Sequence, residues 1–432
     1  MSSAKKVLKN LDPKLAAETY LPSVKAPQEI KVDEVKLRRV ARPIRNVRHI
    51  PIKAQVFHSK DGPLEFSYER KIKTPIPKNK LVVQVTHCAL NPIDAKIRNG
   101  YVTATSGEIG IGREYSGIVT HVGSDIAYAW HEGDEVFGIY YHPHLAIGAM
   151  QSALLIDPKS DCIAIKPKNI SFAEAAGSMW CFGSAFNILD RLYKSKYLKP
   201  ESNVLINGGT SSVGMFAIQL LKRYYKVQQK LVVITSSNGP EILSEKFPDL
   251  ADEMIFVNYL TCRGKSSKPL RKMIKEQKVD TFHETNDVSE GDATPYTQGK
   301  FDIVLDFVGG YDIVAHSSSL IHSGGAYVTT VGDYVANYKD DIYNSWDNPS
   351  ANARKIFGAV MWSYDYSHFY FNPTPGSASK NEWIEKCSEM LADETVKCVV
   401  YKTLDWKKTA EAFKILQTQR AQGKIVLEVE EF

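Results

Sequence analysis

Cysteine is scarce in this sequence, and no cysteine stands in a metal-binding or disulfide pattern. The 432 residues hold six cysteines, which are scattered along the chain without a Cys-x-x-Cys pair. Zinc clusters and disulfide frameworks need cysteines at short, regular spacings. We therefore expect neither of them, and a reducing compartment suits the chain.

Long hydrophobic runs are missing as well. No apolar run reaches the roughly 20 residues that a bilayer-spanning helix needs. The first residues are not followed by the apolar segment of a secretory signal. Any membrane association is therefore expected to be peripheral. The hydrophobic content of 43% and the mixed charge are typical of a globular protein, and the length favours two domains.

Acidic residues are absent from one stretch near the N-terminus. Between Val35 and Lys60 every charged side chain is basic, with apolar residues interleaved and prolines at 43 and 51. Such a stretch suits an anionic lipid surface, where each cation contributes about 1 kcal/mol. It also suits an acidic protein or a nucleic acid, or it is simply a solvated arm. We expect no nucleic acid, and we assign membrane or partner binding to Lys36, Arg38, Arg39, Arg42, Arg45 and Arg48.

A glycine-rich turn between a predicted strand and a predicted helix is the central motif. The apolar run Val204–Asn207 leads into the turn, and apolar residues then recur at helical spacing as far as Tyr224. Small residues let a diphosphate approach the backbone, and the helix start favours its charge. Alternatively, the glycines only permit tight packing of helix on strand. The predicted cofactor-binding residues here are Gly208, Gly209, Thr210, Ser211, Ser212, Val213 and Gly214.

Three further apolar runs, at 231–235, 253–258 and 301–306, alternate with helical stretches. This alternation predicts an α/β fold with a parallel, doubly wound sheet of the Rossmann type.

The end of the second predicted strand bears on the choice of nucleotide. NAD sites usually place an acidic side chain there to bind the ribose 2′-hydroxyl. This turn has no acid before Glu241, and Ser236 and Ser237 can donate to a 2′-phosphate. If a dinucleotide binds, NADP(H) is therefore favoured over NAD(H).

Five motifs occur in an order that is similar to that of a known superfamily. They are Asn91-Pro-Ile-Asp94, Gly112–Val119, Gly133–Val136, the glycine turn and Gly423–Leu427. The order resembles that of the medium-chain dehydrogenase/reductase superfamily, and within it the zinc-free quinone-oxidoreductase branch. The resemblance implies a Rossmann domain inserted in a GroES-like β-barrel substrate domain. It also implies that Tyr259 contacts the cofactor.

The implied organisation has four parts. They are a basic N-terminal extension (1–51), the first part of the GroES-like domain (52–177), the Rossmann domain (178–333), and an insert with the return to the GroES-like domain (334–432). Two stretches are additions to the superfamily pattern. Residues 281–300 are polar and acidic and predict a surface loop. Residues 334–375 include an aromatic run, for which three interpretations are open: it fills a core, it forms a dimer edge, or it docks a partner.

The departures from the superfamily concern metal and catalysis. In zinc-dependent members a cysteine takes the place of Asn91 and a histidine that of Arg113. Asparagine is a weak zinc ligand and arginine is a cation, so we expect no metal. Quinone reductases often carry a tyrosine where Lys96 stands. Lys96 is either a general acid or, more simply, a surface residue, and no catalytic residue is assigned.

Two functions remain open. One is an NADPH-dependent, zinc-independent reductase of quinones or enones. The other is a trafficking or scaffold protein, because the chain resembles a fungal subgroup of peripheral-membrane proteins implicated in delivering the plasma-membrane proton-pumping ATPase. That resemblance implies this ATPase as partner and the cytoplasmic face of endoplasmic reticulum, Golgi and raft-like plasma membranes. The superfamily commonly forms dimers. We favour the trafficking function.

Overall fold

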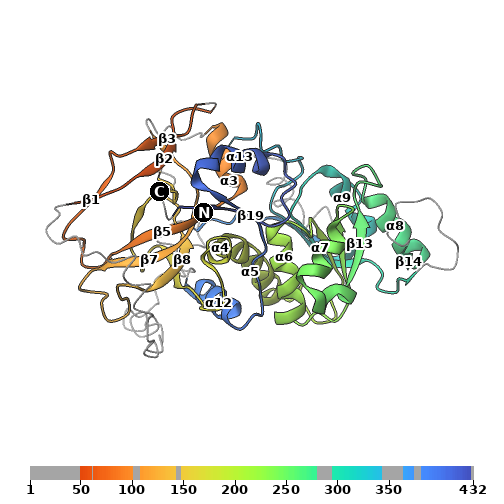
Figure 1. The fold of residues 1–432 in the computed structure, drawn as a ribbon. Coiled ribbons are helices and arrows are strands. Elements are labelled where there is room, and N and C mark those ends of the chain that lie inside the picture. The colour runs from red at the N-terminus through yellow and green to blue at the C-terminus, as the bar shows by residue number, and fades with distance from the viewer. Residues whose placement is uncertain are drawn as a thin grey trace, which may run out of the picture.

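The chain folds into two lobes, each organised around its own β-sheet (Figure 1). The structure is a computed structural model, and it describes residues 49–60, 62–100, 108–142, 147–279, 294–342, 363–373 and 381–429. The predicted fold class, a Rossmann domain beside a GroES-like domain, is confirmed.

The first lobe is built on a seven-stranded sheet of order β10-β8-β7-β5-β20-β19, with β9 also paired to β5. Its strands are β5 (Leu81–Leu90), β7 (Glu114–Val122), β8 (Glu135–Ile139), β9 (Ala153–Ile156), β10 (Cys162–Ile165), β19 (Val400–Asp405) and β20 (Lys424–Glu428). Strand β20 comes from the C-terminal end of the chain and pairs antiparallel with β5. This pairing returns the chain to the first lobe after the second lobe is complete.

Smaller elements extend this lobe. Strand β1 (His49–Pro51) pairs with β4 (Lys71–Lys73), and β2 (Ala54–Phe57) lies between β3 (Glu65–Ser67) and β6 (Ile109–Gly110). The helical segments associated with this lobe are α3 (Pro92–Asn99), α4 (Phe172–Ala176), η4 (Trp406–Lys408) and α13 (Thr409–Gln417). The stretch assigned to the N-terminal extension therefore ends in a strand that pairs with the body.

The second lobe is built on a six-stranded sheet of order β13-β12-β11-β16-β17-β18, in which every neighbouring pair is parallel. The strands are β11 (Val204–Asn207), β12 (Leu231–Thr235), β13 (Met254–Asn258), β16 (Phe301–Asp306), β17 (Ile321–Thr329) and β18 (Asp365–His368). Strands β11 and β12 are buried along their whole length, as a parallel sheet covered on both faces requires.

Helices cover both faces of this sheet. They are α5 (Met179–Lys194), α6 (Ser212–Gln219) with the π-helical turn η2 (Leu220–Tyr224), α7 (Gly239–Lys246), η3 (Pro248–Glu253), α8 (Ser267–Glu276), α9 (Tyr311–Ala315) and α10 (Ser317–Leu320). Helix α12 (Asn381–Ala392) packs on α5 and on β10 of the first lobe.

A two-stranded ribbon pairs β14 (Lys278–Val279) with β15 (Thr294–Pro295), which lies inside the predicted loop 281–300. Because Tyr296 is also buried, the prediction of a surface loop is wrong for the end of this stretch. Most of that loop lies outside the described residues.

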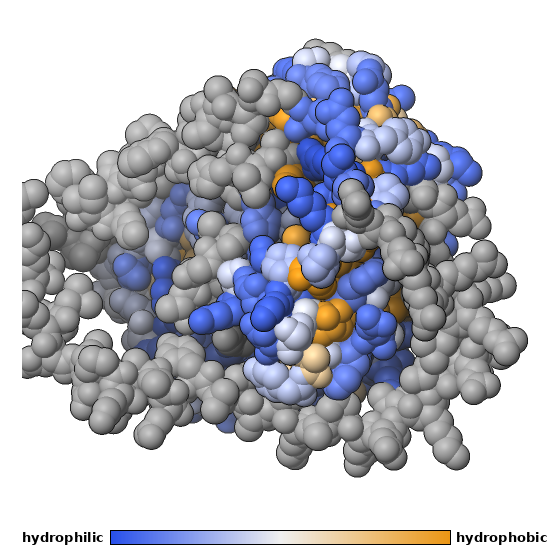
Figure 2. Space-filling model, turned by 90° about the vertical axis from the view of Figure 1, so that its left-hand side faces the viewer, coloured by the Kyte–Doolittle hydropathy of each residue, from blue (hydrophilic) through white to orange (hydrophobic). Residues whose placement is uncertain are grey.

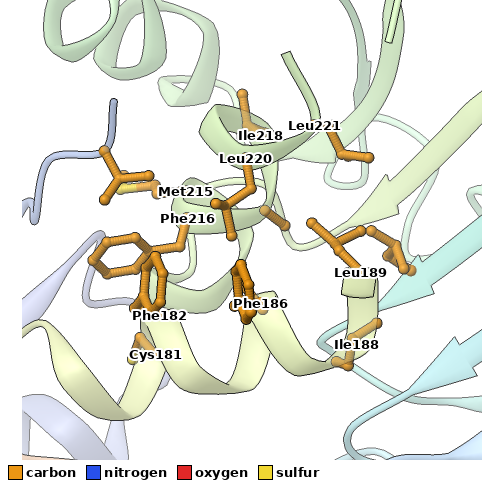
Figure 3. Close-up of a cluster of buried hydrophobic side chains, with 14 of the residues drawn as sticks. Cys181, Phe182, Phe186, Ile188, Leu189, Met215, Phe216, Ile218, Leu220 and Leu221 are labelled. Atoms are coloured by element: carbon orange, nitrogen blue, oxygen red, sulfur yellow. The ribbon is translucent and has the colours of Figure 1, made fainter. Parts of the chain in front are cut away.

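The main core lies where α5 packs on α6 (Figure 3). Phe182 and Phe186 stack at 5.4 Å between ring centroids, and Phe216 meets Phe182 edge-on at 6.0 Å. All three rings are buried. This packing fixes the axis of α6 and therefore the position of the glycine turn at its N-terminus.

The aromatic run is partly described, and its described side chains mostly fill the core. Tyr366 of β18 is buried and stacks on Tyr327 with ring centroids 5.4 Å apart. Phe371 meets Trp180 and Trp383 at 5.5 and 5.4 Å. Of the three interpretations of this run, core filling therefore accounts for these rings.

Candidate functional site

The sheet of the second lobe has a topological switch point between β11 and β16. From β11 the chain moves outward to β12 and β13, and it then resumes on the other side with β16 and β17. Ligands of doubly wound folds bind outside the carboxyl ends of the strands at this point. The predicted glycine turn follows β11 directly, so the structure places it where a nucleotide would enter.

Packing within the protein already requires glycine at three positions of the turn. Gly208 adopts φ +92°, a conformation that favours glycine. A Cβ at Gly209 would collide with the Val233 side chain, and a Cβ at Gly214 would collide with the carbonyl of Gly208. The motif is thus explained by the close approach of α6 to the strand, with or without a ligand.

The hydroxyl groups of the turn bond to the protein itself. The Ser211 Oγ accepts a hydrogen bond from the Gly214 N–H (3.0 Å) and donates to the Gly208 carbonyl (2.7 Å). The hydroxyls of Thr210 and Thr235 lie 3.2 Å apart. The donors that α6 offers outward are the N–H groups of its first turn at Ser212 and Val213, which have no preceding helical carbonyl.

The turn after β12 is predicted to bind the ribose of the nucleotide. In the structure it is hydrogen-bonded to Gln422 of the other lobe. The Ser236 Oγ donates to Asn238 Oδ1 (2.8 Å) and accepts from Gln422 Nε2 (3.2 Å). Gln422 Nε2 also donates to Asn238 Oδ1 (2.9 Å). The Ser237 Oγ accepts from Asn258 Nδ2 (3.0 Å). Both serines therefore have partners, and Gln422, just before β20, stands where a ribose would bind.

Tyr259, the remaining predicted cofactor residue, follows β13 at the same edge of the sheet. Its side chain is 38% exposed, and its N–H donates to the Thr235 carbonyl at 3.1 Å. The structure therefore brings all ten predicted cofactor residues to the carboxyl edge of the sheet.

Asp306, at the end of β16, holds the loop that faces the glycine turn from the β16 side of the switch point. The fully buried carboxylate accepts hydrogen bonds from Asn207 Nδ2 (2.8 Å), the Tyr327 hydroxyl (2.7 Å) and the N–H groups of Val308 (3.1 Å) and Gly309 (2.9 Å). Burial raises the pKa of Asp306 more than these hydrogen bonds lower it. Asp306 therefore holds the 308–310 loop against the glycine turn.

A second contact joins the lobes through α3. Lys96 Nζ, on α3, donates to the Tyr334 hydroxyl at 3.1 Å, and both side chains are half-buried. Asn99 Nδ2, one turn along α3, donates to the carbonyls of Tyr338 (3.0 Å) and Asp341 (2.9 Å). Lys96 is thus a partly exposed residue with a hydrogen-bond partner in the other lobe, and its expected role as general acid or plain surface residue stays open.

A buried charge network lies where β5, β7 and β20 of the first lobe meet α5. The Glu114 carboxylate is completely buried and accepts from Lys424 Nζ (2.6 Å), Asn91 Nδ2 (2.7 Å) and the Trp180 N–H (2.6 Å). Lys424 Nζ also donates to Asn91 Oδ1 at 2.7 Å and lies 3.8 Å from Cys181 Sγ. Burial lowers the pKa of Lys424, but Cys181 and Glu114 outweigh burial and raise it.

A buried arginine extends this network. Arg113 Nη1 donates to the carbonyls of Gly110 (3.1 Å) and Gly112 (2.6 Å) and lies 3.6 Å from Asp94 Oδ1. The other Asp94 oxygen accepts from the Asn91 N–H at 2.8 Å. Burial raises the pKa of Asp94, and the Arg113 charge opposes that rise. The protein interior thus holds two ion pairs, Lys424 with Glu114 and Arg113 with Asp94.

Comparison with known proteins identifies the family. Residues 77–166 match the alcohol dehydrogenase GroES-like domain, and residues 276–427 match the zinc-binding dehydrogenase family. Protein AST1 of Saccharomyces cerevisiae is 63% identical over 430 residues, covering 99% of this chain and 100% of AST1. The chain belongs to the medium-chain dehydrogenase/reductase superfamily.

A second yeast protein and a solved structure are also similar to this chain. Protein AST2 of the same yeast is 62% identical over 431 residues, covering 99% of this chain and 100% of AST2. The quinone oxidoreductase of Coxiella burnetii shares the fold with a TM-score of 0.59 and 21% identity, covering 88% of this chain and 99% of that chain. The likeness to AST1 and AST2 takes in the basic N-terminal stretch as well as the folded body.

The superfamily includes zinc-binding members, but the residues here do not fit zinc. At the two ligand positions of zinc-dependent members stand Asn91 and Arg113, and the ammonium of Lys424 is bonded to Asn91. Zinc takes thiolate, imidazole or carboxylate ligands, and two neighbouring cations repel it. Within the described residues no group of three or more histidine, cysteine or acidic side chains is placed to hold a metal.

The backbone of this site suits a nicotinamide dinucleotide, but the side chains of the site are already bonded to one another. The open N–H groups of Ser212 and Val213 suit a diphosphate, and the family typically binds NAD(P). The nucleotide would have to compete with Gln422 for Ser236.

The sequence alone did not point to Gln422, Tyr334 or Lys424. Gln422 and Lys424 flank Gly423 of a recognised motif, but nothing in that motif names their partners.

The predicted membrane-binding residues, from Lys36 to Arg48, lie outside the described residues. Among the helices that the structure describes, none is long and apolar enough to cross a membrane.

Proposed function

We propose that this chain is a peripheral-membrane trafficking or scaffold protein on a dehydrogenase-like fold. In this role it aids the delivery or clustering of a plasma-membrane proton-pumping ATPase. It works on the cytoplasmic face of endoplasmic reticulum, Golgi and raft-like plasma membranes, and the basic extension holds it there.

The trafficking role comes from the resemblance to the fungal subgroup, and what supports it is that the likeness to AST1 and AST2 spans the whole chain, extension included. Hydride transfer has no use for a basic extension, and fold alone does not settle function. The described crevice supports the same conclusion, because the hydroxyls of Thr210, Ser211, Ser236 and Ser237 all have internal partners.

The body also supports an electrostatic attachment. Strand β1 starts at His49, directly after Arg48 in the sequence, and it pairs with β4 at the left-hand end of the first lobe in Figure 1. Figure 2 faces this end of the molecule, and its coloured surface is mostly hydrophilic with separate hydrophobic spots. Attraction to a membrane at this end would therefore depend on charge and weaken with salt.

The test is flotation with liposomes that contain phosphatidylserine. A variant with Arg38, Arg39, Arg42, Arg45 and Arg48 changed to alanine should stay unbound, while the wild type floats. A matched control changes five exposed cations of the far lobe, namely Lys265, Lys268, Lys272, Lys275 and Lys278. Equal flotation of both variants would contradict the proposal, because it would leave the basic stretch without a specific role.

The client is tested in yeast cells that lack their own AST proteins. Cells carrying the variant without the five arginines should retain less proton-pumping ATPase at the surface than cells carrying the lysine control. Normal surface delivery with the arginine variant would show that attachment through this stretch is not needed for trafficking.

We also propose that a second copy is a partner. Strand β18 is the edge of the six-stranded sheet, and its outer side pairs with no other strand of the described chain. Exposed edges offer backbone groups for pairing. Sedimentation equilibrium should show a dimer, and a proline at Ser367 should shift it towards monomer.

The second candidate function is a zinc-independent, NADPH-dependent reductase of quinones or enones. The position of the glycine turn at the switch point favours it. Titration calorimetry with NADPH, and with NADH beside it, tests this function. Micromolar binding that prefers NADPH would support it, whereas binding of neither nucleotide would exclude it.

A further inference from the structure

Lys96 of α3 in the first lobe meets Tyr334, which follows β17 in the second lobe. Gly309 adjoins Tyr334, since a Cβ on Gly309 would lie 2.6 Å from the Tyr334 carbonyl. The same loop faces the glycine turn, since a Cβ on Gly208 would lie 2.7 Å from the Val308 side chain. A continuous wall therefore runs from the glycine turn to the Lys96–Tyr334 contact.

The topology assigns each half of the six-stranded sheet to one half of a dinucleotide. In doubly wound folds each half of the sheet binds one nucleotide, on either side of the switch point. The ribose turn with Ser236 belongs to the β12 half, so the adenosine would lie there. The β16 half, where Val308 and Tyr334 lie, would receive the nicotinamide.

The chemistry of the contact fixes the direction of its hydrogen bonds. A lysine ammonium can only donate, so the Tyr334 oxygen is the acceptor of the 3.1 Å bond. The hydroxyl proton of Tyr334 is then left to donate elsewhere. It has no acceptor among the residues that the structure describes, and Tyr334 as a whole is partly exposed.

The Lys96 ammonium also lies 5.7 Å from the centre of the Tyr334 ring, which strengthens the hold on the side chain. The positive charge favours electron withdrawal from the hydroxyl oxygen, so the O–H becomes a better donor. The arrangement is that of a positioned hydrogen-bond donor supported by a cation.

We propose that Lys96 and Tyr334 form a carbonyl-binding pair that protonates an α,β-unsaturated aldehyde or ketone. This inference rests on the reductase function. Nicotinamide, when bound in its reduced form, supplies a hydride with two electrons to the β-carbon. The Tyr334 hydroxyl bonds the carbonyl oxygen and gives its proton to the resulting enolate oxygen. Lys96 returns a proton to Tyr334 and is itself reprotonated by water.

The first test measures binding without turnover. Trans-cinnamaldehyde is titrated into protein loaded with oxidised NADP, and the carbonyl stretching band is recorded by Raman spectroscopy. In the wild type the band should shift to lower frequency. Tyr334→Phe should abolish the shift and weaken binding by about tenfold, the cost of one hydrogen bond. Lys96→Met should reduce the shift, and Lys96→Arg should retain most of it.

The second test measures turnover of the same aldehyde with NADPH. Tyr334→Phe should lower kcat by about 10²–10⁴-fold, as expected for the loss of a general acid, and KM should rise in step with the weaker binding of the aldehyde. Tyr128→Phe is the matched control, because Tyr128 is 81% exposed and lies in the other lobe between β7 and β8. It should leave both readouts unchanged.

The outcomes separate this inference from the reductase function. If the wild type reduces the aldehyde and Tyr334→Phe keeps its kcat and its carbonyl band, the pair is refuted and the reductase stands. If the wild type binds NADPH but neither binds nor reduces the aldehyde, the reductase function is refuted for this substrate class. The carbonyl-binding pair is refuted with it.

Discussion

Lys424→Met removes the cation from the buried network between the lobes. The change leaves the side-chain volume nearly the same but deletes the ammonium that bonds Glu114 Oε2 and Asn91 Oδ1. Glu114 is completely buried and Lys424 is 3% exposed, so water cannot replace the lost partner. Breaking such a pair costs about 3–5 kcal/mol, because an uncompensated charge stays inside the protein.

Urea unfolding followed by tryptophan fluorescence measures this loss, and Trp180 lies beside Glu114 as a reporter. The control is Lys402→Met on β19, whose partner Glu411 is 2.9 Å away but with both side chains 45% exposed. This exposed pair should contribute less than about 1 kcal/mol. A similar loss in both variants would refute the argument from burial.

The double variant Glu114→Gln/Lys424→Met removes the unpaired charge as well. It should recover at least about 2 kcal/mol relative to the sum of the single changes, because contacting residues couple in a mutant cycle. Additive losses would show that Lys424 acts on stability through contacts other than its bond to Glu114.

Three further predictions concern the crevice and its support. Gln422→Ala should tighten NADPH binding about five- to thirtyfold by calorimetry, because the nucleotide no longer displaces one or two hydrogen bonds; weaker binding would show that Gln422 contacts the nucleotide instead. Burial raises the pKa of Asp306, so its protonated form favours folding and this contribution is lost as the pH rises through the folded pKa. Asp306→Asn should therefore gain stability relative to wild type in urea unfolding as the pH rises above about 4, the ordinary pKa of an aspartate, and a difference that stays constant with pH would refute the assignment. Phe216→Ala should cost about 3–5 kcal/mol of unfolding free energy through the cavity it opens under α6, and a loss below about 1 kcal/mol would show that the site collapses.

The elements of the fold followed from local patterns. The runs at 231–235 and 301–306 are buried strands because consecutive apolar residues suit a parallel sheet that is covered on both faces. The glycine turn at Gly208 was recognisable because a strand, small residues and helical spacing adjoin in the sequence. The strand order and the return of β20 to β5 rested on the resemblance of ordered motifs and not on residue spacing.

The partners of the polar side chains were decided by the tertiary structure. Lys424 meets Glu114 across 310 residues of sequence, Lys96 meets Tyr334 across 238, and Gln422 meets Ser236 across 186. A buried charge or amide must find a partner, but the sequence does not say which one. By itself the sequence determined the strands, the turn and the basic stretch, because these depend on neighbouring residues. Whether a cation or a metal balances Glu114, and whether Ser236 is free for a nucleotide, depends on which distant segments the fold brings within hydrogen-bond distance.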